Sequence, residues 1–406
     1  MMDVQRIRKD FPMLKAHPEL VYFDNGATTL KPQCVIDAVN DFYTAHTSNV
    51  HRGDYAIASL NDRLYDGARG SFAKLLNCSS QEIIFTHNAT ASLNQIAWGL
   101  GHDFLKPGDV ILTTEAEHAS NLLPWFRMKE EYGVEVRYVP LDNQANLDLS
   151  EFAKALTPEV RAVAVAMVTN VLGSIQPIKE ISRMAHAQGA LVIVDGAQAV
   201  PHMKVDVKDL DIDFLAFSAH KMCGPSGVGI LYGKKQLLDA MSPVFMGGDM
   251  NARFQKECTY ELKKGPSKFE AGTPNIEGVI ASAKACEYLM EIGLDEIHAY
   301  EKELRAYFLE QMQKLGNIEI YNPDNLYGPI DFNAKGVFSQ DAAGYLASRN
   351  IAVRSGNHCA KILHEVIGTD STIRASLYFY NTKEEVDRCV SACADISLEN
   401  AIGIFF

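Results

Sequence analysis

Two short apolar segments that end in polar residues constrain this chain more than any other feature. The first, LVIVD, ends at Asp195. The second, DFLAFS, is followed by one alanine and then by His220 and Lys221. Apolar runs of this length, flanked by helix-like sequence, are typical of strands buried on both faces of a parallel sheet. Ligands bind at the carboxyl ends of such strands, so we expect Asp195 and Lys221 to face one crevice.

A lysine and a carboxylate in one crevice are the pair that pyridoxal phosphate (PLP) requires. The lysine forms a Schiff base with the cofactor, and the carboxylate keeps the pyridine nitrogen protonated. Most lysines are solvated surface charges, and an aspartate after a strand is often a helix cap. Lys221 differs because it follows a buried strand among Ser218, His220 and Gly224. Buried lysines serve readily in Schiff bases.

The first 290 residues alternate apolar segments with helix-like ones. Strands are expected at residues 82–86, 109–114, 161–168 and 227–233, and helices at 33–46, 59–76 and 177–188. This alternation predicts a wound, mostly parallel α/β sheet. Thr90, His118 and Asn170 each follow one of these strands, so we expect them at the same crevice. Thr90 also starts a helix, which is a natural seat for a phosphate group.

The length of the chain, 406 residues, predicts more than one domain. We assign residues 21–290 to a large cofactor-binding domain and 291–406 to a small C-terminal α/β domain. Residues 1–20 are expected to pack with the small domain. Long helices are expected at 277–293 and 295–315, and residues 245–275 are rich in glycine, lysine and polar residues.

Composition excludes some classes of protein. The net charge of −13 argues against nucleic acid as a partner. No apolar run is long enough for a membrane span, and the N-terminus does not resemble a signal peptide. Eight cysteines without a CxxC pair indicate a reducing compartment, so we expect a cytoplasmic protein.

Cys359 is the candidate nucleophile, since it lies in the polar, glycine-bearing loop AVRSGNHCAKIL. An isolated cysteine is usually a small core residue, and that interpretation holds for the other seven. Here Arg354 and His358 are expected to provide positive potential that favours the thiolate, and the loop could act as a lid. A metal site made of His358, Cys359 and His364 lacks the usual zinc spacing, so no metal is expected.

Arg374, in the segment STIRASLYFYNT, is a candidate for binding a substrate carboxylate through its guanidinium fork. The alternative is an ordinary surface ion pair. The carboxylate interpretation gains weight only together with PLP, because an amino-acid substrate would need such a group.

Seven segments together resemble one family of PLP enzymes. They are TEAEHASNLLPW, TNVLGSIQPI, VDGAQAVPH, FSAHKMCGPSGVGILYG, FEAGTPN, RSGNHCA and IRASLYFYNT. The chain resembles the class V aminotransferase family of fold-type I PLP enzymes, and within it the group II, SUF-type cysteine desulfurases and the related selenocysteine lyases. The resemblance runs from YFDNGATT near the start to the last of these segments. It departs from the usual pattern at Asn88-Ala89-Thr90, at Ser355 and at Lys361-Ile362.

The resemblance implies a role for each candidate residue. Lys221 would hold the cofactor covalently, and Cys359 would accept sulfur from the substrate. Asp195 would bind the pyridine nitrogen and Gln198 the ring hydroxyl, while His118 would stack on the ring and move protons. The residues implied for the phosphate are Thr90, Ser218, His220 and, from the partner subunit, Thr273. The residues implied for the substrate carboxylate and cofactor geometry are Asn170, Arg374 and Arg354.

The implied activity is conversion of L-cysteine to L-alanine, with sulfur passing to a SUF-type acceptor protein for iron–sulfur cluster assembly. A homodimer is implied as well. The alternatives are a selenocysteine lyase acting on L-selenocysteine, a plain aminotransferase that would not need Cys359, and a cofactor-free scaffold. Intact Lys221 and Asp195 argue against the scaffold.

Overall fold

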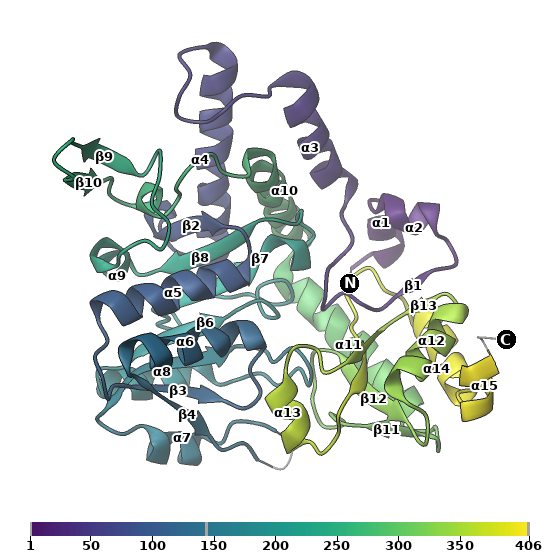
Figure 1. The fold of residues 1–406 in the computed structure, drawn as a ribbon. Helices are drawn as coiled ribbons and strands as arrows, with labels where there is room; N and C mark the ends of the chain where they lie inside the picture. Colours follow the sequence, from purple (N-terminus) through teal and green to yellow (C-terminus); the bar gives the residue numbers. More distant parts are fainter. Residues whose placement is uncertain (1, 143–144, 404–406) are drawn as a thin grey trace.

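The computed structural model describes residues 2–142 and 145–403. A seven-stranded sheet with the order β2-β8-β7-β6-β5-β3-β4 forms its centre (Figure 1). The strands are β2 (Ile83–Thr86), β3 (Val110–Thr114), β4 (Glu135–Val139), β5 (Val160–Ala166), β6 (Leu191–Asp195), β7 (Phe214–Ser218) and β8 (Gly229–Gly233). Strands β4, β3, β5, β6 and β7 run parallel, whereas β8 pairs antiparallel with β7 and β2. The predicted wound, mostly parallel sheet is confirmed.

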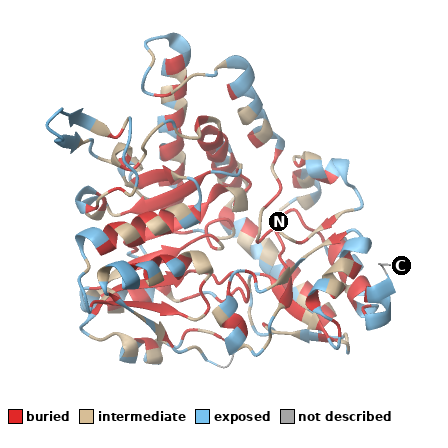
Figure 2. Ribbon diagram, viewed as in Figure 1, coloured by how far each residue is buried: buried red, intermediate tan, exposed pale blue. Residues whose placement is uncertain are grey.

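Helices cover both faces of this sheet, which explains why its central strands read as continuous apolar runs. In β6, Val192 and Val194 join the core under one set of helices, and Ile193 joins the core on the opposite face. The helices packed on the first face include α4 (Ala56–Leu76), α8 (Ile178–Ala187) and α10 (Ile276–Ile292). Those on the second are α5 (Ala89–Asp103) and α6 (Leu123–Tyr132). Figure 2 shows the strands buried between these layers.

A second hydrophobic core lies in the C-terminal part of the chain. Its antiparallel sheet has the order β11-β12-β15-β14. The strands are β11 (Ile318–Ile320), β12 (Ile330–Ala334), β14 (Arg354–Gly356) and β15 (Thr372–Ala375). The helices packed on this core include α11 (Leu294–Met312), α12 (Ser339–Ser348) and α14 (Lys383–Ala394). Val21 and Phe23 also belong to it, because β1 (Val21–Tyr22) pairs with β13 (Ile351–Ala352).

The N-terminal segment, with α1 (Val4–Arg8) and α2 (Pro12–Ala16), contacts both parts of the molecule. Arg8 forms an ion pair of 2.8 Å with Glu385 of α14. Phe11 packs against Tyr380, with ring centroids 4.6 Å apart, and against Tyr288 of α10 at 6.1 Å. The domain boundaries given above stay a prediction.

Most predicted elements are present within one to three residues of their expected ends, including α3 (Gln33–Ala45). Several other elements were not predicted, and two of them show why. Strand β4 is an edge strand with exposed Glu135 and Arg137, so it lacks an apolar run. The second is the exposed hairpin of β9 (Asn251–Phe254) and β10 (Tyr260–Leu262), within the polar 245–275 segment. No helix within residues 2–142 and 145–403 is long and apolar enough to cross a bilayer.

Candidate active site

A cavity of about 280 Å³ opens at the carboxyl ends of the central strands, where the second core meets the sheet. Every predicted site residue except Thr273 lines it. These residues are Thr90, His118, Asn170, Asp195, Gln198, Ser218, His220, Lys221, Arg354, Cys359 and Arg374. The fold therefore brings together side chains that are up to 284 positions apart in the sequence, from Thr90 to Arg374.

Lys221 and Asp195 lie on neighbouring strand ends. Asp195 is the last residue of β6 and pairs with Ala216 of β7, and Lys221 follows β7 by one short turn. The Asp195 side chain is buried, and its Oδ1 accepts a hydrogen bond from the Ala197 amide at 2.9 Å. Burial lowers the pKa of Lys221 to about 8, although the nearby Asp195 carboxylate acts in the opposite direction. Burial also raises the pKa of Asp195.

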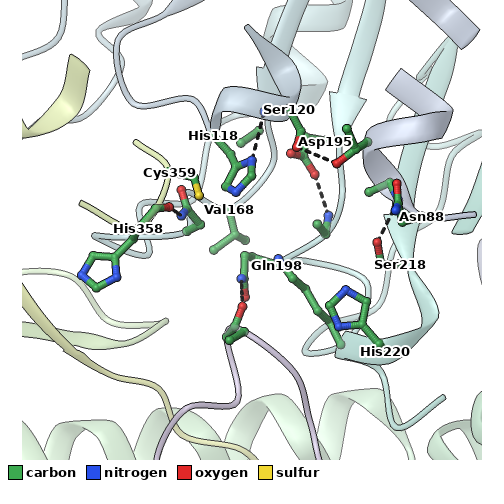
Figure 3. A pocket seen from close by; sticks show the side chains of 18 of the residues that line it. Asn88, His118, Ser120, Val168, Asp195, Gln198, Ser218, His220, His358 and Cys359 are labelled. Atoms are coloured by element: carbon green, nitrogen blue, oxygen red, sulfur yellow. Dashed lines mark hydrogen bonds between the residues drawn. The ribbon is translucent and has the colours of Figure 1, made fainter. Parts of the chain in front are cut away.

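The start of α5 forms a polar pocket at one end of the cavity. Asn88 caps this helix, since its Oδ1 accepts from the Ala91 amide at 2.8 Å. The Ala89 amide donates to Ser218 Oγ at 2.8 Å, which fixes the helix to the end of β7 (Figure 3). Gly229 of β8 permits this approach, because a Cβ there would lie 2.4 Å from the Asn88 backbone. Free amides and the positive end of the helix dipole suit a phosphate group.

His118 faces the same cavity as a neutral imidazole. Its Nδ1 accepts from the Ser120 amide at 3.0 Å, so the ring hydrogen lies on Nε2 (Figure 3). Burial, with Lys221 and Arg374 nearby, lowers the pKa of His118 to about 4. A neutral ring of this kind can stack on an aromatic cofactor and can also accept or return a proton. Gln198 is held in place by donating from Nε2 to the Gly26 carbonyl at 2.8 Å.

Arg374 and Asn170, the residues predicted to bind the substrate carboxylate, lie together in the lining of the cavity. The buried Arg374 guanidinium donates from Nη1 to the Asn170 carbonyl at 2.9 Å. Its Nε and the Asn170 Oδ1 are buried and have no hydrogen-bond partner within residues 2–142 and 145–403. Arg354 is more exposed and pairs with Asp24, with 3.2 Å between Nε and Oδ1. Asp24 was not singled out from the sequence; its only signal there is its place in the YFDNGATT segment.

Cys359 lies exposed at the mouth of the cavity, on the loop between β14 and α13 (Lys361–Val366). The loop is fixed to the large sheet, because the Ala119 amide donates to the Cys359 carbonyl and Asn170 Nδ2 donates to the His358 carbonyl, both at 2.8 Å. The expected positive charge from His358 is wrong. Its ring points away from the cavity (Figure 3), and burial lowers its pKa to about 3.

Thr273 lies in a neighbouring cavity of about 650 Å³. Asn88 and Thr90 line both cavities, so the second one borders the helix start that suits a phosphate. Within this chain, Thr273 Oγ1 accepts a hydrogen bond of 3.3 Å from Asn49. Its predicted role in a partner subunit's site stays a prediction.

The model of the Aminotransferase class-V family matches residues 21–389, which is most of the chain. The chain belongs to the class-V aminotransferase family. It is 42% identical to a probable cysteine desulfurase from Halalkalibacterium halodurans, covering 95% of this chain and 96% of that one. It is 39% identical to a cysteine desulfurase from Haloferax volcanii, covering 96% of both.

Solved structures give the same result for this class-V family member. The apo structure of a cysteine desulfurase from Thermococcus onnurineus has a TM-score of 0.93 and 38% identity, covering 97% of this chain and 98% of that one. A cysteine desulfurase from Escherichia coli has a TM-score of 0.91 and 35% identity, covering 100% and 99%. The predicted family and fold type are therefore confirmed.

The cofactor of this class-V family is pyridoxal phosphate, as predicted, and the cavity fits it. A lysine with a lowered pKa faces a buried carboxylate, and a capped helix start with the Ser218 hydroxyl lies at one end. A neutral imidazole supplies a flat surface. Ser120, whose Oγ lies 2.7 Å from that of Thr90, extends the polar end and was not predicted.

Proposed function

We propose that this chain is a PLP-dependent cysteine desulfurase that converts L-cysteine to L-alanine and holds the sulfur as a persulfide on Cys359. The observation that carries the proposal is that an exposed thiol, a half-buried lysine and a buried arginine line one cavity. A plain aminotransferase has no use for a thiol at that place. The relatives named cysteine desulfurase support the same activity.

Bound PLP supplies an electron sink for the charge that develops at the substrate Cα. Lys221 is suited to move the Cα proton, because a lysine whose pKa is near 8 is partly unprotonated at neutral pH. Arg374, with Asn170 beside it, orients the substrate by its carboxylate. The Cys359 thiolate attacks the substrate sulfur. The carbon–sulfur bond breaks with its electrons staying on carbon, which takes up a proton and leaves as L-alanine.

We propose in addition that the protein works as a cytoplasmic homodimer, in which Thr273 of the partner subunit completes the phosphate site. The persulfide sulfur would pass from Cys359 to a SUF-type acceptor protein. The exposed position of Cys359 supports transfer to a second protein, and all eight cysteines are free, which suits a reducing compartment.

The Cys359→Ser variant tests the proposal. We expect it to keep the visible absorbance of the bound cofactor and the spectral change on adding L-cysteine, but to lose alanine formation by a factor of 100 or more. Mass spectrometry of the wild type after one turnover should find one extra sulfur on the Cys359 peptide.

Cys258 provides the matched control, because it is also an exposed free thiol but lies on the β9–β10 hairpin and not at the cavity. Cys258→Ser should keep full activity. If the Cys359→Ser variant formed alanine at the normal rate and still carried a persulfide, another group would be the sulfur acceptor.

A further inference from the structure

Next to the Cys359 loop lies a buried polar cluster that the proposed chemistry does not use. We call it the Thr372 cluster. It consists of His358, His364, Asp331 and Thr372, and all four residues are buried, with exposed fractions between 0% and 7%. They come from the Cys359 loop, helix α13, strand β12 and strand β15 respectively. Two of its members therefore flank the candidate nucleophile in the sequence.

The Thr372 hydroxyl is the centre of this cluster. Its Oγ1 lies 2.9 Å from Asp331 Oδ1, 3.1 Å from His358 Nε2 and 3.3 Å from His364 Nε2. A hydroxyl has one hydrogen and two acceptor lone pairs, so three partners use its full capacity. Substituting Thr372 with an apolar side chain would therefore leave three buried polar atoms without their common partner.

Counting hydrogens shows that the cluster shares one additional proton. His364 Nδ1 lies 3.0 Å from the Ala360 carbonyl and must donate to it. The three contacts to the Thr372 hydroxyl need one hydrogen each. If Asp331 is ionised and both rings are neutral, one of these hydrogens is missing, because the His364 ring uses its own hydrogen on the Ala360 carbonyl. With this proton the cluster is neutral as a whole. Burial raises the pKa of Asp331 well above its ordinary value, in agreement with a retained proton. Neutrality lowers the cost of burying these groups, although Asp331 Oδ2 and His358 Nδ1 have no hydrogen-bond partner among the described residues.

The backbone at Cys359 needs such an anchor. His358 and Cys359 both have left-handed φ values, +50° and +59°, which are strained for residues other than glycine. From the large sheet, Asn170 and Ala119 hold the two carbonyls of this segment. From the opposite side, the Thr372 cluster holds the His358 ring and the first turn of α13. Thr372 also lies two residues from Arg374 on β15, so both project from the same face of the strand.

We propose that Thr372, with Asp331 and His364, acts as a positioning residue that fixes the Cys359 thiol relative to the substrate held by Arg374. This inference rests on the proposed function, in which Cys359 attacks the substrate sulfur. Thr372, Asp331 and His364 do not line the cavity, so they act on the chemistry only through the Cys359 loop. Misplacing a reacting group by about 1 Å can lower a rate by about 100-fold, which sets the scale of the expected effect.

The test compares Thr372→Val, which removes the hydroxyl at nearly constant shape, with Thr372→Ser, which keeps it, in the PLP-loaded enzyme. We expect kcat for alanine formation to fall about 10- to 100-fold in Thr372→Val. KM for L-cysteine and the spectral change on binding it should stay within about twofold, because Arg374 and the cofactor site are not touched. Thr372→Ser should recover most of the rate. Equal kcat in the wild type and Thr372→Val, or an equal loss in both variants, would overturn the inference.

Amide hydrogen exchange across residues 357–364 gives a readout that does not depend on the activity. Exchange should be faster in Thr372→Val than in the wild type and Thr372→Ser, and identical exchange in all three would overturn the inference. Failure of the proposed function would be seen separately, as a wild-type enzyme without persulfide on Cys359. If Thr372→Val does not fold, His364→Asn replaces it, since asparagine can keep the donor to Ala360 and lose the contact to Thr372. His364→Gln, which can keep the Thr372 contact, is its control.

Discussion

At the scale of single residues, the lowered pKa of Lys221 leads to a prediction about pH. Its value of about 8 means that the cofactor-free protein gains a reactive amine as the pH rises through 8 instead of 10.5. The rate of rebinding added PLP, followed by visible absorbance, should therefore rise about tenfold per pH unit below pH 8 and level off above it. The Lys221→Ala variant should bind PLP at a rate that does not show this rise with pH. A rate that continues to rise to pH 10 would contradict the burial argument.

The place of a residue in the cavity could be predicted from the sequence where its side chain follows a buried strand. Asp195, His118 and Lys221 were found in this way, because the carboxyl ends of adjacent strands meet at one edge. The direction of a ring in a loop could not be predicted. His358 adjoins Cys359 in the sequence but points to Thr372, a contact across 14 positions that only the fold creates.

At the scale of elements, the capped start of α5 leads to a prediction that separates stability from binding. Asn88→Ala removes the cap at Ala91 and should cost about 1 kcal/mol of unfolding free energy. Thr382→Ala removes the cap of α14, where Thr382 Oγ1 accepts from Glu385 N, and should cost about the same. Only Asn88→Ala should also weaken PLP binding, several-fold, because α14 does not reach the cavity. Denaturation and equilibrium dialysis measure the two effects, and equal PLP affinity in both variants would exclude α5 as the phosphate seat.

Elements were predictable where burial imposes a pattern. The apolar runs of β5, β6 and β7 come from helices on both faces of the sheet, and the long helices α4 and α10 pack their apolar sides on it. The β9–β10 hairpin buries little, since Phe254 and Tyr260 are 74% and 64% exposed. A hairpin without a buried face leaves no alternation for the sequence to show.

At the scale of the whole molecule, the sequence predicts that residues far apart meet, but not how the two cores close over the cavity. That closure depends on contacts such as those of Asp24 with Arg354 and Arg374, which join the start of the chain to β14 and β15. The long-range pairing of β1 with β13 places Asp24 there. Two strands of two residues each carry too little pattern to be paired from sequence alone.

The proposed homodimer leads to a complementation experiment, because each site would combine Lys221 of one subunit with Thr273 of the other. Lys221→Ala subunits should be inactive, and Thr273→Ala subunits should lose cofactor affinity. In a mixed dimer, one site keeps both native residues and the other loses both. Co-expressed, differently tagged subunits purified as the mixed species should therefore regain about half of the wild-type activity at limiting PLP. If Thr273 acted within its own chain, the mixed dimer would contain no intact site, and its activity would not exceed half that of Thr273→Ala.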